Sequence, residues 1–112
     1  MSKEDINKII EVAENLEWNV TIDGEYFELS KFSPAGQDFN IGIDGVEDID
    51  SLVALLYERY LNFDVSEETY LWLDNSGHGQ NGVPYDMKDL YNDMEACQEM
   101  ILELYKELDI IL

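Results

Sequence analysis

The residues of this chain that could do chemistry are carboxylates, one histidine and one cysteine. Asp and Glu number 26 against 6 Lys and Arg, which gives a formal net charge of −20. His78 lies between two glycines, while Cys97 lies inside an apolar helical pattern, which is typical of a buried thiol in a reducing compartment. A catalytic pair would require these two side chains to meet. We therefore predict no catalytic residues and no enzymatic activity.

A glycine motif resembles a nucleotide-binding loop only in part. Residues 77–82 read G-x-G-x-x-G, which in a dinucleotide-binding unit follows a strand and opens a helix. Here Pro84 intervenes, and the residues after it predict one helix with no second parallel strand. The strong negative charge also repels phosphate. We expect a loop without a nucleotide, and we predict no cofactor.

Carboxylates are also the ligands that calcium prefers. In a twelve-residue calcium-binding loop starting at Asn40, Asp44 and Gly45 would match the fifth and sixth positions. Gly42 and Ser51 would occupy the third and twelfth positions, where side-chain ligands are required. We predict no metal site, with weak calcium binding by the acids of residues 44–50 as the alternative.

The carboxylates themselves form rows and clusters. Glu95, Glu99 and Glu103 follow one another four residues apart, and Glu107 extends the row, with a rise of about 6 Å per step on a helix. Like charges at this spacing cost roughly 0.2–0.5 kcal/mol per pair, and we expect only Lys106 to relieve them. The candidate partner-binding residues are Asp23, Glu25, Asp38, Asp44, Glu47, Asp48, Asp50, Glu67, Glu68, Glu95, Glu99 and Glu103.

Two of these groups have neighbours that extend them. We expect Asp38 to join the acids of residues 23–25 and 44–50 at the end of the sheet. Asp86, Asp89 and Asp93 continue the negative charge at the start of the last helix, where the helix dipole favours acids. We expect that reversing the charges of residues 44–50 removes partner binding without loss of stability.

Hydrophobic periodicity predicts the elements that must position these acids. Apolar residues at helical spacing predict helices over residues 3–16, 47–62 and 86–110, the first capped by Ser2 and the last by Asp86. Alternating apolar residues predict strands over residues 18–22, 25–32 and 38–43, joined by a two-residue turn at Asp23 and Gly24 and a second turn at residues 33–36. Residues 66–73 favour a short helix, with a strand as the alternative, and residues 75–84 predict a loop.

We therefore expect one α+β domain covering residues 1–112. Its centre is a three-stranded antiparallel β-meander packed by an N-terminal helix and C-terminal helices, in the order α-β-β-β-α-α-α. The aromatic and aliphatic content is sufficient for a core, unlike that of a disordered acidic chain.

The last predicted helix has two apolar seams at heptad spacing. The functional interpretation is a dimerising coiled coil, and the alternative is a helix packed within its own chain. Two methionines and a cysteine make a poor dimer seam, so we favour internal packing and a monomer. The seam residues are Met87, Leu90, Met94, Cys97, Ile101, Leu104, Leu108 and Ile111.

The net charge restricts the class of partner. Direct binding to nucleic acid or to an anionic membrane requires a cationic surface, so we expect neither. No apolar stretch is long enough for a signal peptide or a membrane span, and we expect a cytoplasmic protein. The charge suits a protein that presents carboxylates to the basic nucleic-acid-binding groove of a nuclease or another DNA-binding protein.

Three segments carry a resemblance to a known family. Residues 5–10 leading into residues 18–22, and residues 90–95 in the last helix, resemble the small acidic anti-CRISPR proteins that block type II-A RNA-guided nucleases. Residues 64–85 are an insertion relative to that pattern, so no contact residues are carried over. The resemblance implies an inhibitor from a phage or mobile element that covers the groove in which the nuclease reads its adjacent motif with arginines. Anti-restriction proteins of mobile elements are a related possibility, because they too present negative charge to a nucleic-acid-binding groove.

The leading hypothesis is therefore a charge mimic of nucleic acid that inhibits a DNA-handling enzyme. The alternative is a non-enzymatic interaction or adaptor domain that docks through aromatic anchors such as Tyr70, Trp72 and Tyr85. A third interpretation is that the acidic surface is an adaptation to high salt.

Overall fold

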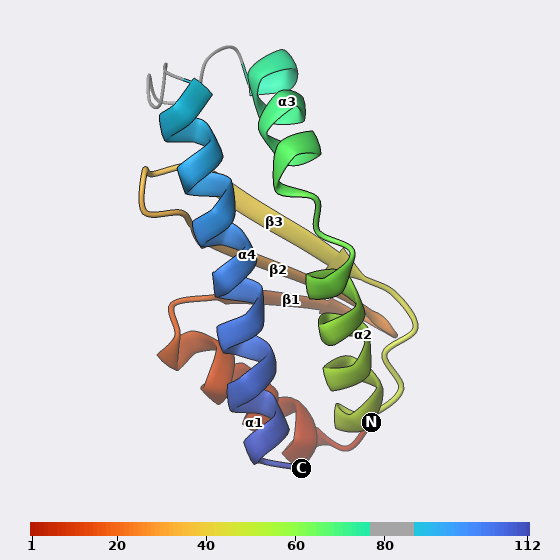
Figure 1. Cartoon of the computed structure of the whole chain (residues 1–112). Coiled ribbons are helices and arrows are strands. Elements are labelled where there is room, and N and C mark those ends of the chain that lie inside the picture. Colours follow the sequence, from red (N-terminus) through yellow and green to blue (C-terminus); the bar gives the residue numbers. More distant parts are fainter. Residues whose placement is uncertain (77–86) are drawn as a thin grey trace.

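The chain follows the predicted order of one helix, three strands and further helices. The computed structural model describes the backbone of residues 1–76 and 87–112, and the side chains of residues 1–71 and 87–112. The elements are α1 (Lys3–Asn15), β1 (Asn19–Asp23), β2 (Tyr26–Phe32), β3 (Asp38–Ile43), α2 (Ile49–Leu61), α3 (Val65–Ser76) and α4 (Met87–Ile110) (Figure 1). The fold is α+β, and α3 is the predicted helix, not the alternative strand. The G-x-G-x-x-G motif, His78 and the predicted Asp86 cap lie outside the described residues.

The strands form the predicted antiparallel meander, in the order β1-β2-β3. Asp23 pairs with Tyr26 across the first hairpin, so the turn residues are Gly24 and Glu25. The prediction of a turn at Asp23 and Gly24 was wrong by one residue. Gly24 has a φ of 62°, which glycine adopts without steric cost, and a glycine at the first turn position is typical of a type II′ hairpin.

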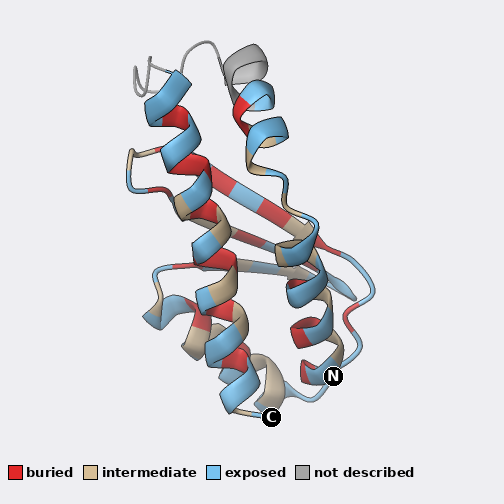
Figure 2. Cartoon of the chain, viewed as in Figure 1, coloured by how far each residue is buried: buried red, intermediate tan, exposed pale blue. Residues whose placement is uncertain are grey.

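One face of the sheet carries the core and the other faces solvent. Alternate residues of β2 and β3 are buried and exposed, as Figure 2 shows along both strands. The buried side chains join those of α1, α2 and α4 in one hydrophobic cluster, and each contributes about 1.5–3 kcal/mol to folding. The core residues from the two strands are Phe27, Leu29, Phe39, Ile41 and Ile43.

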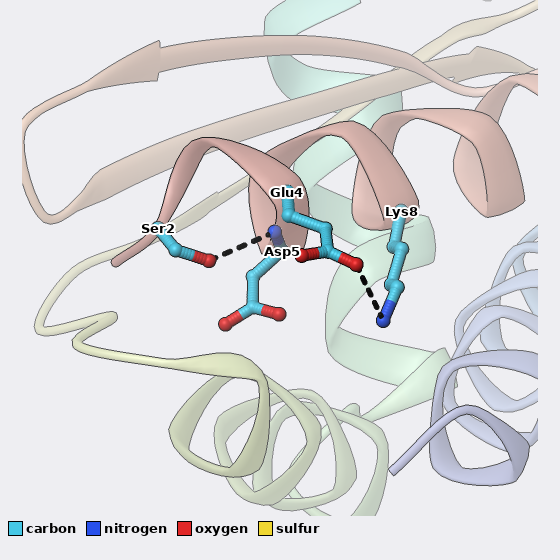
Figure 3. A network of polar contacts seen from close by, with 4 residues as sticks. All are labelled: Ser2, Glu4, Asp5 and Lys8. Atoms are coloured by element: carbon cyan, nitrogen blue, oxygen red, sulfur yellow. Dashed lines mark hydrogen bonds and ion pairs between the residues drawn. The ribbon is translucent and has the colours of Figure 1, made fainter.

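The start of α1 has the cap that the sequence predicts. The Asp5 backbone N–H donates to Ser2 Oγ at 3.1 Å, which satisfies one of the free donors at the helix start (Figure 3). One turn along, Lys8 Nζ lies 3.7 Å from Glu4 Oε1. Both side chains of this ion pair are exposed, so it contributes at most a few tenths of a kcal/mol.

The apolar seams of α4 pack within the chain. Leu90, Met94, Cys97, Ile101 and Leu104 are completely buried, and α4 lies against α2 and α3 along its length. These residues therefore pack inside the chain, as predicted, and do not form an exposed coiled-coil seam. Among the described helices, none combines the length and the apolarity that crossing a membrane requires.

Candidate acidic interface

The predicted partner-binding acids fall into three groups and one isolated residue. All are exposed except Glu68, which is half-buried. The first group, called here the sheet-end acids, consists of Asp23, Glu25, Asp44, Glu47, Asp48 and Asp50. The second is Glu67 and Glu68 at the start of α3. The third is Glu95, Glu99 and Glu103, which together with Glu107 are called here the α4 row. The isolated residue is Asp38.

Strand pairing brings the sheet-end acids together. Phe27 pairs with Ile43, and the Val46 N–H donates to the Glu25 carbonyl at 2.9 Å, so the segment after β3 lies beside the first hairpin. Asp38 pairs with Phe32 at the opposite end of β3. The expectation that Asp38 joins this cluster was therefore wrong, because a strand of this length separates its two ends by roughly 17 Å.

Two sheet-end acids also have structural roles. Asp48 caps α2: its Oδ1 accepts from the Ser51 N–H at 2.8 Å, while Ser51 Oγ accepts from the Asp48 N–H at 3.0 Å. Asp44 Oδ1 accepts from the Gly45 N–H at 2.9 Å. Reversing Asp48 would remove the carboxylate half of this reciprocal cap, worth about 1 kcal/mol. We therefore revise the expectation that charge reversal at residues 44–50 leaves stability unchanged.

The acids at the start of α3 interact with neighbouring residues of the chain. Asp64 Oδ1 accepts from the Glu67 N–H at 3.1 Å, which caps the helix. Burial raises the pKa of the Glu68 carboxyl, the charge of Glu67 raises it further, and Arg59 opposes both. Arg59 in turn donates from Nη2 to the Gly42 carbonyl at 2.6 Å, which links α2 to β3. Glu68 is thus a less freely available charge than the exposed acids.

The α4 row has the geometry that its spacing predicts. All four glutamates are exposed on a helix of 24 residues. Lys31 of β2 places its Nζ 4.0 Å from Glu103 Oε1, so the cation that pairs with the row comes from the sheet. The expectation that only Lys106 relieves the row was wrong, because within the described structure Lys31 makes an ion pair with the row and Lys106 makes none. Glu95, Glu99 and Glu107 make no ion pair with any residue that the structure describes.

Asp93 belongs to none of these surface groups. Its side chain is only 4% exposed, and it accepts from Ser33 Oγ at 2.6 Å and from the Ala35 N–H at 3.0 Å. Ser33 Oγ also accepts from the Gln37 N–H at 2.9 Å. Asp93 therefore fastens the β2–β3 connection to α4, and its prediction as surface charge was wrong. A signal was present in the sequence, because Asp93 lies three residues after Leu90 and four before Cys97 on the apolar face.

The remaining reactive side chain has no catalytic setting in the described structure. Cys97 is completely buried, and burial together with the charges of Asp93 and Glu68 raises its thiol pKa well above the usual range. A thiolate nucleophile needs the opposite shift. Within the described ranges, no group of three or more His, Cys, Asp or Glu side chains could hold a metal ion.

No protein-family model, no curated protein and no solved structure matches the chain.

Proposed function

We propose that this protein binds the basic nucleic-acid groove of a DNA-handling enzyme, an RNA-guided or restriction nuclease, and inhibits it by mimicking nucleic-acid charge. The observation that carries the proposal is the α4 row. It is a regularly spaced row of exposed carboxylates, rising about 6 Å per step, on a helix whose other side is packed into the core. Charges held in this way lose little conformational freedom on binding, unlike those of a disordered acidic tail.

The α4 row also has a cost that folding alone does not explain. Each like-charged step along a helix opposes folding by roughly 0.2–0.5 kcal/mol. Glu95, Glu99 and Glu107 have no compensating ion pair in the described structure. A partner that supplies arginines or lysines would relieve this repulsion, with charge-assisted hydrogen bonds that are often bidentate for arginine. Electrostatic attraction would also speed the encounter.

The overall shape supports the same proposal. The chain is elongated, with extents of 44 × 24 × 22 Å, so it can lie along a groove built for a nucleic-acid strand or duplex. The sheet-end acids supply a second patch of exposed charge, on the strand ends and the start of α2. The two patches together would engage a longer stretch of basic groove than either alone.

Binding to purified nucleases tests the proposal directly. A guide-loaded type II-A RNA-guided nuclease and a restriction enzyme would be immobilised, and the affinity for this protein measured from about 0.05 M to 0.5 M salt. We expect affinity to fall steeply with salt and E95Q/E99Q/E107Q to bind at least tenfold more weakly. The matched control E11Q/E14Q/E28Q removes the same charge from exposed positions outside the row and should change affinity less than threefold. Equal losses in the two variants would remove the row from the interface.

The adaptor alternative is favoured by a different observation. Tyr70 and Leu71 on α3 are 58% and 43% exposed, respectively. Exposed aromatic and aliphatic side chains can anchor a protein interface without a contribution from charge. A partner that binds this way should respond weakly to salt and should lose affinity with Y70A, while E95Q/E99Q/E107Q binds normally.

A further inference from the structure

A groove of about 560 Å³ lies beside the α4 row. One wall is the end of β2 and the start of the next connection, residues 31–34, and the other is α4 with Ala96, Glu99, Met100 and Glu103. Glu17, just after α1, completes the lining. Met100 is 9% exposed, so its side chain gives the floor of the groove a buried apolar surface.

The charge around this groove is mostly uncompensated. Glu17, Glu99 and Glu103 line it, and Lys31 is its one cation within the described structure. Lys31 is already engaged: its side chain is 15% exposed, and its Nζ lies 4.0 Å from Glu103 Oε1 and 5.9 Å from the centroid of the Trp18 ring. Glu17 and Glu99 remain without an ion pair in the described structure. The groove is therefore complementary to a side chain that is apolar along its length and cationic at its tip.

Glu17 occupies a position where glycine would be more stable. Its φ is 69°, and the Trp18 N–H donates to the Ala13 carbonyl while the Glu17 N–H donates to the Glu14 carbonyl, both at 2.9 Å. This is the Schellman pattern that ends a helix, and glycine is strongly preferred at its left-handed residue. A glutamate there places a carboxylate at the groove in spite of the backbone strain.

We infer that the groove receives an arginine side chain from the partner's basic surface. The methylene stem would lie against Met100 and Pro34, and the guanidinium would meet Glu17 and Glu99. Arginine fits better than lysine because its planar guanidinium binds carboxylates in bidentate fashion. This inference rests on the proposed function, because it specifies one contact of the same basic partner.

Peptide titration followed by NMR tests the groove without a nuclease. Hexa-arginine, hexa-lysine and hexa-citrulline peptides would be added to the ¹⁵N-labelled full chain. We expect saturable shifts at the amides of residues 17, 31–33 and 96–103, with arginine binding at least threefold tighter than lysine and citrulline not binding. Equal affinity for the arginine and lysine peptides, or shifts spread evenly over every acidic surface, would overturn the inference.

Two variants separate binding from folding. E17Q keeps the chain length of the side chain and removes its charge, and we expect it to weaken hexa-arginine binding about threefold to tenfold. E17G should weaken binding similarly while raising the melting temperature, so its loss of binding cannot be attributed to misfolding. The control E14Q, on the exposed face of α1, should bind as the wild type does. Unchanged binding by both Glu17 variants would contradict the inference.

The outcome is distinguishable from that of the proposed function. If E95Q/E99Q/E107Q weakens nuclease binding but the groove shows no arginine preference, the charge-mimic proposal stands and the groove inference is wrong. If the arginine preference is found and neither nuclease binds, the groove inference stands as a contact for another basic protein and the proposed target class is wrong.

Discussion

The two sides of α4 use carboxylates in opposite ways. On one side, Asp93 is buried and accepts two hydrogen bonds from the β2–β3 connection, so its carboxyl group holds this connection against α4. On the other side, the α4 row is exposed and largely unpaired, so its charge opposes the fold. Residues of the same chemistry, a few positions apart, therefore separate into a structural role and a candidate binding role. Burial and hydrogen bonding decide which role applies, and the net charge of the chain does not.

The largest change in stability should come from removing the buried Asp93 carboxylate. We expect D93A to lower the free energy of unfolding by about 2–4 kcal/mol, because the Ser33 hydroxyl and the Ala35 N–H would lose their acceptor in a buried site. Chemical denaturation measures this change. D89A, at an exposed position one turn earlier on α4, is the control and should change stability by less than about 0.5 kcal/mol. A similar small change for D93A would show that the connection does not depend on this carboxylate.

A cap at the sheet end should give the next largest effect. We expect D48A to cost about 1 kcal/mol, because it removes the acceptor for the Ser51 N–H at the start of α2. D50A in the same turn removes a charge without removing this hydrogen bond, and it should cost less. Thermal denaturation of the two variants compares them, and equal destabilisation would mean that the cap contributes nothing beyond charge.

Neutralising the α4 row should change the free energy of unfolding in the opposite direction. We expect E95Q/E99Q/E107Q to raise the free energy of unfolding by up to about 1 kcal/mol at low salt, because the like-charged steps along the helix are removed. The gain should shrink at high salt, since screening already weakens this repulsion in the wild type. Denaturation at two salt concentrations checks both statements, and a loss of stability would show that the row supports the fold.

A smaller effect concerns the pH dependence of Glu68. Its pKa is raised in the folded state above the ordinary value of 4.5, so the folded protein binds this proton more tightly than the unfolded chain. Stability from this group is therefore greatest at low pH and falls as the pH rises above 4.5 through the folded pKa. We expect E68Q to be more stable than the wild type at neutral pH, with the difference disappearing below pH 4.5, where both states are protonated. A constant difference at all pH values would contradict this assignment.

The local patterns of the sequence predicted most of the fold. Alternation of apolar residues predicted the strands, and helical spacing predicted that Cys97 and its neighbours on α4 are buried. The α4 row was predictable for the same reason, because its regularity depends only on residues four apart on one helix. Strand register is not local, and the Gly24–Glu25 turn was mispredicted for that reason. Asp38 was misplaced although the predicted meander already puts the start of the third strand at the end of the sheet opposite the first hairpin.

Asp93 and Glu17 show a different limit of sequence reasoning. Asp93 was interpreted as one more surface acid, although its spacing from Leu90 and Cys97 placed it on the apolar face. Its partner Ser33 lies 60 residues away in the sequence, so only the folded chain shows the bond. The positive φ of Glu17 is equally invisible in composition, because glycine is the residue expected at the end of such a helix.

The most direct test of the central claim is whether this protein and DNA exclude each other on the same enzyme. The guide-loaded nuclease, its target duplex and this protein would be mixed and their complexes resolved by sedimentation velocity. The charge-mimic account predicts that the enzyme forms one complex with DNA and another with this protein, that the two interconvert with concentration, and that no complex contains all three. A stable ternary complex would show that the acidic surface lies outside the nucleic-acid groove, which would contradict the account.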